Sequence, residues 1–175
     1  TGLAPVTTYY YKVTARDVNL NESSASTETS ARPADNIAPA APAVPTVADV
    51  PSDQGFALRL NWTPTAETDI REYRIYKSTN SGVTAVSSHV VTTVLSPGST
   101  HQEGSLTNGT TYYYAFAARD TSGNESSLSP QGSGIPYDNL APSSPTAVGV
   151  ADVPGDQGFA LRLSWSANTE TDLKD

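Results

Sequence analysis

The chain has 175 residues, a formal net charge of −8 and no cysteine, and 37% of its residues are hydrophobic. The missing cysteines exclude disulfide frameworks and thiolate metal sites, and an acidic surface repels nucleic acid and anionic lipid. Apolar runs are only a few residues long, so we expect no membrane insertion. Because the net charge is negative, we expect no nucleic-acid partner. Because the sequence begins at Thr1 and contains no Met, we interpret it as part of a longer polypeptide.

Alternation of apolar and polar residues predicts short β-strands along the chain, and no stretch has a helical period. The clearest pattern places Phe56, Leu58, Leu60 and Trp62 on one face of a strand, where Trp62 has the size to fill the centre of a sandwich. Further strands are predicted around Tyr73 and Ile75, from Val90 to Val94, from Tyr112 to Ala118 and from Leu128 to Ile135. Turn-forming Pro, Gly and Asn residues separate these runs, so the predicted fold class is all-β.

An internal repeat divides the chain. Residues 48–62 read ADVPSDQGFALRLNW and residues 151–165 read ADVPGDQGFALRLSW, identical at thirteen of fifteen positions and offset by 103. A unit of about a hundred residues has the size of a small β-sandwich. The register predicts that 1–36 is the C-terminal part of one module (strands F and G), that 37–138 is a complete module, and that 139–175 is the N-terminal part of a third (strands A and B).

The segment LAPVTTY at residues 3–9 has the pattern L-x-P-x-T-x-Y, and the chain also carries Trp62 and a Tyr-x-Ile motif at Tyr73. Together these motifs resemble the tyrosine corner and strands B and C of fibronectin type III domains. The resemblance implies tandem immunoglobulin-like antiparallel β-sandwiches of a secreted bacterial protein, in which the hydroxyls of Tyr9 and Tyr112 bond back to the preceding corner. Asn108 stands where the pattern has Pro, which we expect to loosen the corner of the complete module.

Acidic residues in the predicted loops and linkers suggest a calcium site, because calcium takes about six to eight oxygen ligands. We expect Asp49, Asp53 and Asp69 to approach one another near one end of the sandwich, with further ligands from the linkers. The candidate set is Asp35, Asn36, Asp49, Asp53, Asp69, Asp138 and Asn139, and the equivalents in the third segment include Asp152, Asp156 and Asp172. The alternative is that these residues cap turns through hydrogen bonds to their own backbone.

Other candidate sites have simpler interpretations. Residues 17–22, DVNLNE, resemble the start of an EF-hand loop but lack its glycine and its distant glutamate, which favours a plain turn between strands F and G. His89 and His101 stand in no metal-ligand or triad spacing, which favours solvent-exposed residues at strand edges. Outward-facing tyrosines either form a sugar-stacking or partner surface or support cross-strand pairs, the simpler interpretation; these are Tyr10, Tyr76 and Tyr113.

Near-identical repetition without a catalytic motif favours a structural function rather than an enzyme. The leading hypothesis is an array of spacer and adhesive modules in an extracellular bacterial surface protein or filament. Its partners would be neighbouring modules, identical chains or surface glycans, and no cofactor other than calcium is expected. The alternative is an accessory carbohydrate-binding or spacer module of a secreted polysaccharide-degrading enzyme.

Overall fold

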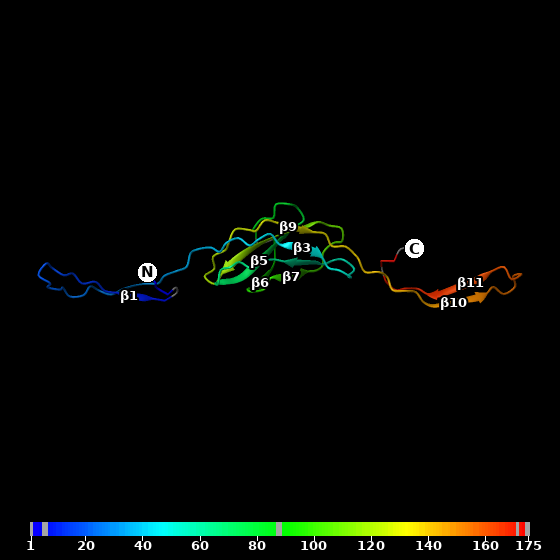
Figure 1. Cartoon of the computed structure of the whole chain (residues 1–175), viewed down its shortest axis with the longest axis horizontal. Coiled ribbons are helices and arrows are strands. Elements are labelled where there is room, and N and C mark those ends of the chain that lie inside the picture. The colour runs from blue at the N-terminus through cyan, green and yellow to red at the C-terminus, as the bar shows by residue number, and fades with distance from the viewer. Residues whose placement is uncertain (1, 5–6, 87–88, 171, 174–175) are drawn as a thin grey trace.

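The computed structural model describes residues 2–4, 7–86, 89–170 and 172–173 (Figure 1). No helix in this part of the chain is long and apolar enough to span a membrane. In chain order the strands are β1 (Tyr9–Tyr11), β2 (Thr29–Ala31), β3 (Thr46–Asp49), β4 (Leu58–Asn61), β5 (Ile70–Ser78), β6 (Val90–Leu95), β7 (Thr100–Glu103), β8 (Tyr112–Asp120), β9 (Gly132–Gly134), β10 (Thr146–Asp152) and β11 (Leu161–Ser166).

Strands β3 to β9 form two antiparallel sheets that make up a central sandwich (Figure 1). One sheet has the order β3-β4-β7, and the other has the order β6-β5-β8-β9. The chain therefore passes from one sheet to the other between β4 and β5, between β6 and β7 and between β7 and β8, as in sandwiches with Greek-key connections. This arrangement confirms the all-β, immunoglobulin-like antiparallel β-sandwich that the sequence predicts.

Side chains of β4, β5 and β8 fill the space between the sheets. Trp62, which directly follows β4, packs edge-on against Phe116 of β8 and Tyr73 of β5, with ring centroids 4.9 Å and 5.7 Å away. Aromatic pairs in this geometry add about 0.5–1.5 kcal/mol to the free energy that area burial supplies. The rest of the core is aliphatic or aromatic and includes Leu58, Leu60, Ile70, Ile75, Leu106, Tyr112, Tyr114 and Ala118.

The two remaining pairs of strands form hairpins on opposite sides of the sandwich (Figure 1). Strand β1 pairs with β2, and β10 pairs with β11. The apolar residues of these hairpins face no second sheet within the described residues. Trp165 is 61% exposed, whereas Trp62, at the same place in the repeat, is 6% exposed. The module boundaries drawn after residues 36 and 138 stay predictions.

The strand predicted from Phe56 to Trp62 begins later than its pattern indicates. Strand β4 starts at Leu58, and Phe56 lies in the preceding loop with φ of +68° and with 51% of its surface exposed. The assignment of Phe56 to the inner face is therefore wrong. The physical reason is the turn at Gly55, whose φ of +80° breaks the alternation just before the strand.

Two further strands differ from the sequence prediction. Strand β7 was not predicted, because its residues, THQE, have no apolar face. Strand β9 covers only three residues of the predicted run from Leu128 to Ile135, and it contains Gly132 and Gly134. A Cβ atom on Gly134 would lie 2.7 Å from a methyl group of Val47, so glycine lets β9 approach β3 of the opposite sheet.

The predicted tyrosine corner is confirmed in both copies. The Tyr112 hydroxyl accepts a hydrogen bond from the backbone N–H of Thr107 at 3.0 Å. The Tyr9 hydroxyl accepts one from the N–H of Ala4 at 2.8 Å. Each bond ties the start of a strand to the corner that precedes it.

Asn108 does not loosen this corner, contrary to the sequence expectation. Its side-chain oxygen accepts the N–H of Phe56 at 2.9 Å, and its side-chain amide donates to the carbonyl of Gln54 at 3.0 Å. A Cβ atom on Gly55 would overlap the Asn108 side chain, so only glycine fits at that position. Asn108 therefore connects the corner before β8 to the loop between β3 and β4.

Replacing Tyr112 by Phe removes one hydrogen bond and leaves the buried ring in place. We expect Tyr112→Phe to lower the free energy of unfolding by about 0.5–1.5 kcal/mol, because the N–H of Thr107 loses its acceptor. Urea denaturation followed by tryptophan fluorescence measures the change. Tyr113→Phe is the matched control, since Tyr113 is only half-buried and its hydroxyl has no hydrogen-bond partner among the described residues. An equal loss in both variants would contradict the role assigned to the corner.

Candidate functional site

The candidate calcium ligands lie at two opposite ends of the sandwich. Asp49 pairs with Leu58 at the start of β4, whereas Asp69 follows β4 and immediately precedes β5. The length of β4 therefore separates Asp69 from Asp49 and Asp53. The expectation that these three residues approach one another within one module is not met.

Asp35, Asp69 and Asp120 form an acidic cluster at the end of the sandwich that receives the first linker. One carboxylate oxygen of each residue lies within 4.8 Å of the other two. Asp120 is buried, Asp35 is half-buried and Asp69 is exposed. Three carboxylates offer oxygen ligands of the kind that calcium takes. Asn36, the next residue after Asp35, is exposed.

Asp120 is absent from the candidates chosen by sequence, and its own turn already engages it. Both of its carboxylate oxygens accept hydrogen bonds from Asn124, at 2.8 Å from the backbone N–H and at 2.7 Å from the side-chain amide. Burial raises the pKa of Asp120, but the hydrogen bonds from Asn124, Gly123 and Ser122 outweigh burial and hold the pKa below its ordinary value. The carboxylate is therefore charged at neutral pH although it is buried.

The internal repeat carries the signal that would have identified Asp120. Asp17 stands one repeat earlier and makes the same two bonds to Asn21, at 2.9 Å from its backbone N–H and at 2.9 Å from its side-chain amide. The hydrogen bonds between Asp17 and Asn21 close a turn between two antiparallel segments, which the isolated bridge between Arg16 and Glu22 joins. Residues 17–22 thus form the plain turn rather than an EF-hand loop.

Both linker aspartates cap their own backbone, as the alternative interpretation expects. A carboxylate oxygen of Asp35 accepts the N–H of Ile37 at 3.0 Å, and one of Asp138 accepts the N–H of Leu140 at 3.1 Å. Such turns need no metal. Within the described part of the chain, the second carboxylate oxygen of each aspartate accepts no hydrogen bond.

At the opposite end, the loop after β3 binds the linker that leaves β9. The Asp49 carboxylate accepts the N–H of Tyr137 at 3.0 Å and the side-chain amide of Asn139 at 2.7 Å. Asp53 and Asn139 exchange two more bonds: the Asp53 N–H donates to the Asn139 side chain at 3.0 Å, and the Asn139 N–H donates to the Asp53 carbonyl at 3.1 Å. The candidates Asp49, Asp53 and Asn139 therefore meet, and they meet through hydrogen bonds.

A cavity of about 110 Å³ lies where this end of the sandwich meets the following segment. Its lining includes Asp138 from the linker and Asp172 from the third segment, which occupies the repeat position of Asp69. The remaining lining residues are Gln54, Phe56 and Asn108. Acidic residues from the two ends of the repeat therefore come near each other at the junction between segments.

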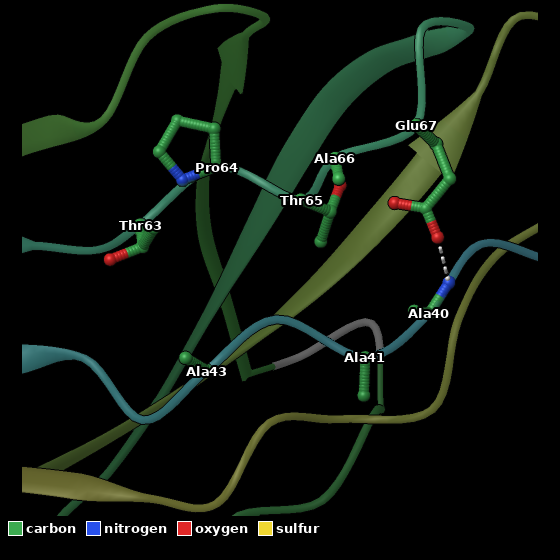
Figure 2. Close-up of a pocket in the computed structure, with 8 residues that line it drawn as sticks. All are labelled: Ala40, Ala41, Ala43, Thr63, Pro64, Thr65, Ala66 and Glu67. Atoms are coloured by element: carbon green, nitrogen blue, oxygen red, sulfur yellow. Dashed lines mark hydrogen bonds between the residues drawn. The ribbon is translucent and has the colours of Figure 1, made fainter.

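A groove of about 570 Å³ lies between the start of the central module and the loop after β4 (Figure 2). In Figure 2 the Glu67 carboxylate accepts the N–H of Ala40, a bond of 2.9 Å that lowers the pKa of Glu67. None of the eight described lining residues is aromatic, so the groove offers no ring on which a sugar could stack. They are Ala40, Ala41, Ala43, Thr63, Pro64, Thr65, Ala66 and Glu67.

The histidines lie in structural surroundings. The Nδ1 atom of His89 is 3.4 Å from the Thr84 hydroxyl. The Nε2 atom of His101, on the edge strand β7, is 3.2 Å from a carboxylate oxygen of Glu103, whose other oxygen accepts from Lys77. The sequence interpretation expected both histidines to be solvent-exposed, and this is wrong, because both are half-buried.

One of the three tyrosines expected to face outward is buried. Tyr76 is only 3% exposed, and its hydroxyl donates to Glu125 at 2.7 Å. The alternation in β5 does not reveal this, because β5 lies inside its sheet and is covered on both faces along much of its length. Tyr113 is half-buried and Tyr10 is 66% exposed. A continuous surface of three tyrosines therefore does not form.

No protein-family model matches the chain. The chain is similar to Exoglucanase B of Cellulomonas fimi, at 29% identity over 185 residues that cover 98% of this chain and 15% of that protein. Among solved structures, an Fn3-like protein from Clostridium thermocellum has 23% identity over 55% of this chain and 92% of its own, with a TM-score of 0.45. The FN1-FN3 domains of chicken CNTN1 have 17% identity over 78% of this chain and 45% of theirs, with a TM-score of 0.49.

Three features of the central sandwich decide its type. The strands divide between the sheets as β3-β4-β7 and β6-β5-β8-β9. A buried tryptophan follows the second strand, and a tyrosine at the start of β8 bonds back to its own corner. These features identify strands β3 to β9 as a sandwich of the fibronectin type III fold.

Proposed function

We propose that this chain is a spacer segment of an extracellular bacterial protein, in which fibronectin type III modules follow one another in a line. The observation that supports this most is the placement of the two linkers, one at each end of the central sandwich (Figure 1). The second linker, residues 136–143, is short, contains Pro136 and Pro142, and leads directly into the next copy of the repeat. An array of this kind gains length with each added module.

Two settings for such a spacer differ in their support. Similarity to Exoglucanase B favours a module of a secreted polysaccharide-degrading enzyme, and it covers nearly the whole of this chain. Adhesion, or assembly into a filament, rests on the repetition alone. We therefore favour a spacer that holds a catalytic domain at a distance from other parts of its parent protein.

Weak carbohydrate binding is a second candidate for the same setting. Its support is the exposed ring of Tyr10 and the half-buried ring of Tyr113, which occupy the same position in two copies of the repeat. Aromatic rings stack on sugars only when their faces are accessible. Since Tyr76 is buried, the available surface is small, and spacing remains the favoured function.

Small-angle X-ray scattering of the chain in solution tests the spacer geometry. We expect an elongated particle whose distance distribution has a peak from the central sandwich and a long tail from the segments on either side. The physical reason is that the linkers leave opposite ends and contain prolines, which favour extended backbone. A symmetric distribution typical of one compact particle would contradict an end-to-end spacer.

Sedimentation with insoluble polysaccharides separates the two candidate functions. We expect the chain to remain in the supernatant with cellulose, chitin and xylan, because the groove beside Glu67 has no aromatic lining residue and the surface of Tyr10 and Tyr113 is small. Retention on one of these polymers would instead favour carbohydrate binding. In that case Tyr113→Ala should abolish retention, and Thr93→Ala, at an exposed position of β6, is the matched control.

The calcium prediction has its best test at the cluster of Asp35, Asp69 and Asp120. Calcium at about five times its Kd should add about 1 kcal/mol to the free energy of unfolding, which raises the Tm of a domain of this size by about 4–8 °C. Differential scanning calorimetry with calcium and then with excess chelator measures the shift. Asp69→Asn should remove the shift and Asp152→Asn should keep it. If neither calcium nor chelator changes the Tm, the calcium prediction is wrong.

A further inference from the structure

The loop between β3 and β4 has the properties of a preformed acceptor for the linker. A carboxylate oxygen of Asp53 accepts the N–H of Gly55 at 2.8 Å, and Gly55 has φ of +80°. The third segment repeats this turn between Asp156 and Gly158, also at 2.8 Å and with φ of +82°. There the turn forms although no linker lies against it among the described residues. The turn from Asp53 to Gly55 therefore needs no linker in order to form.

Asn139 forms hydrogen bonds to this loop through three different groups. Its side-chain amide donates to the carboxylate of Asp49, its side-chain oxygen accepts the N–H of Asp53, and its own backbone N–H donates to the carbonyl of Asp53. Tyr137 adds a bond to the second oxygen of the same Asp49 carboxylate. We call these four residues, Asp49, Asp53, Tyr137 and Asn139, the linker latch.

The chain contains a second copy of the linker that serves as an internal comparison. Asn36 and Asp35 stand one repeat before Asn139 and Asp138. The loop in the register of residues 49–53 would fall before residue 1 for that copy. Asn36 is exposed and has no hydrogen-bond partner among the described residues. Asn36 therefore offers a control position, where the same residue type can be changed without touching Asp49 or Asp53.

The far side of the linker is held by the module that follows. The N–H of Ser143 donates to the Glu170 carboxylate at 3.1 Å, in the same register in which Ala40 donates to Glu67. Only residues 140–142 separate Asn139 from Ser143. Pro142 fixes its own φ and disfavours helical backbone at Ala141, so few torsions in this stretch remain free.

We infer that the loop between β3 and β4 is an interaction surface by which each module captures its own outgoing linker, and that this latch sets the direction in which the next module leaves. The inference rests on the proposed spacer function and deepens it, because a latched joint turns a string of modules into a stiff rod. The recurring motif DVPxDQG is then the acceptor and the recurring Asp-Asn pair is its ligand. An array would repeat the latch at every junction.

Amide hydrogen exchange by NMR on the 175-residue chain tests the latch directly. In the unchanged chain we expect the amides of Tyr137 and Asn139 to be protected about tenfold or more relative to those of Ala34 and Asn36, their repeat equivalents. Asn139→Ala should bring the protection of Tyr137 down to the level of Ala34. Asn36→Ala is the matched control and should change neither linker. Amides of β8 report whether the sandwich stays folded, and they should be unaffected in both variants.

The stiffening is tested by pulsed electron paramagnetic resonance, which the absence of cysteine makes simple. Spin labels on Thr93→Cys and Ser144→Cys, both exposed, span the latch. Their distance distribution should be narrow and should broaden with Asn139→Ala but not with Asn36→Ala. Equal exchange of the two linkers in the unchanged chain, or an unchanged width with Asn139→Ala, would overturn the inference. Scattering would still report an elongated chain in that case, so failure of the latch and failure of the spacer function are distinguishable.

Discussion

Contact between the rings of Trp62, Tyr73 and Phe116 across the two sheets is the interaction on which the central module depends. Trp62 is attached to one sheet, and the other two rings belong to the sheet that faces it. Strands of four residues such as β3 and β4 bury too little surface to be stable alone. Packing the rings edge to face lets these short strands share one buried interior.

The sandwich in turn places its linkers at opposite ends, and each end binds its linker differently. Glu67 and Asn124 hold the incoming linker, through Ala40 and Asp35, on the β5 side. Asp49 and Asp53 hold the outgoing linker on the side where β4 begins. Acidic residues thus work as hydrogen-bond acceptors for backbone N–H groups that no strand satisfies. Much of the chain's negative charge in its loops therefore has a local structural role.

Sequence reasoning performed well where a residue's neighbours in the chain decide its environment. The tyrosine corner and the turn at Asp17 depend on contacts within a few residues, and both were predicted, the corner through the family resemblance. It failed where a distant segment decides. Asn108 was expected to loosen the corner because it stands where the pattern has Pro. The expectation failed because the loop to which Asn108 bonds lies some fifty residues earlier in the chain. Alternation predicted that Tyr76 faces outward. The prediction failed because the burial of Tyr76 depends on how β8 and the turn after it, which carries Glu125, lie against β5.

The two copies of ALRLxW separate what sequence and tertiary structure decide. Alternation by itself predicted a strand with one apolar face in each copy, and β4 (Leu58–Asn61) and β11 (Leu161–Ser166) are those strands. Identity between residues 48–62 and 151–165 determined the length of the repeat. Only the tertiary structure decided whether that face is buried: Leu60 is fully buried, whereas Leu163, its repeat equivalent, is 59% exposed. The reason is that backbone dihedral preference acts locally, while burial requires a second sheet, which β5 and β8 supply to β4 and no described strand supplies to β11.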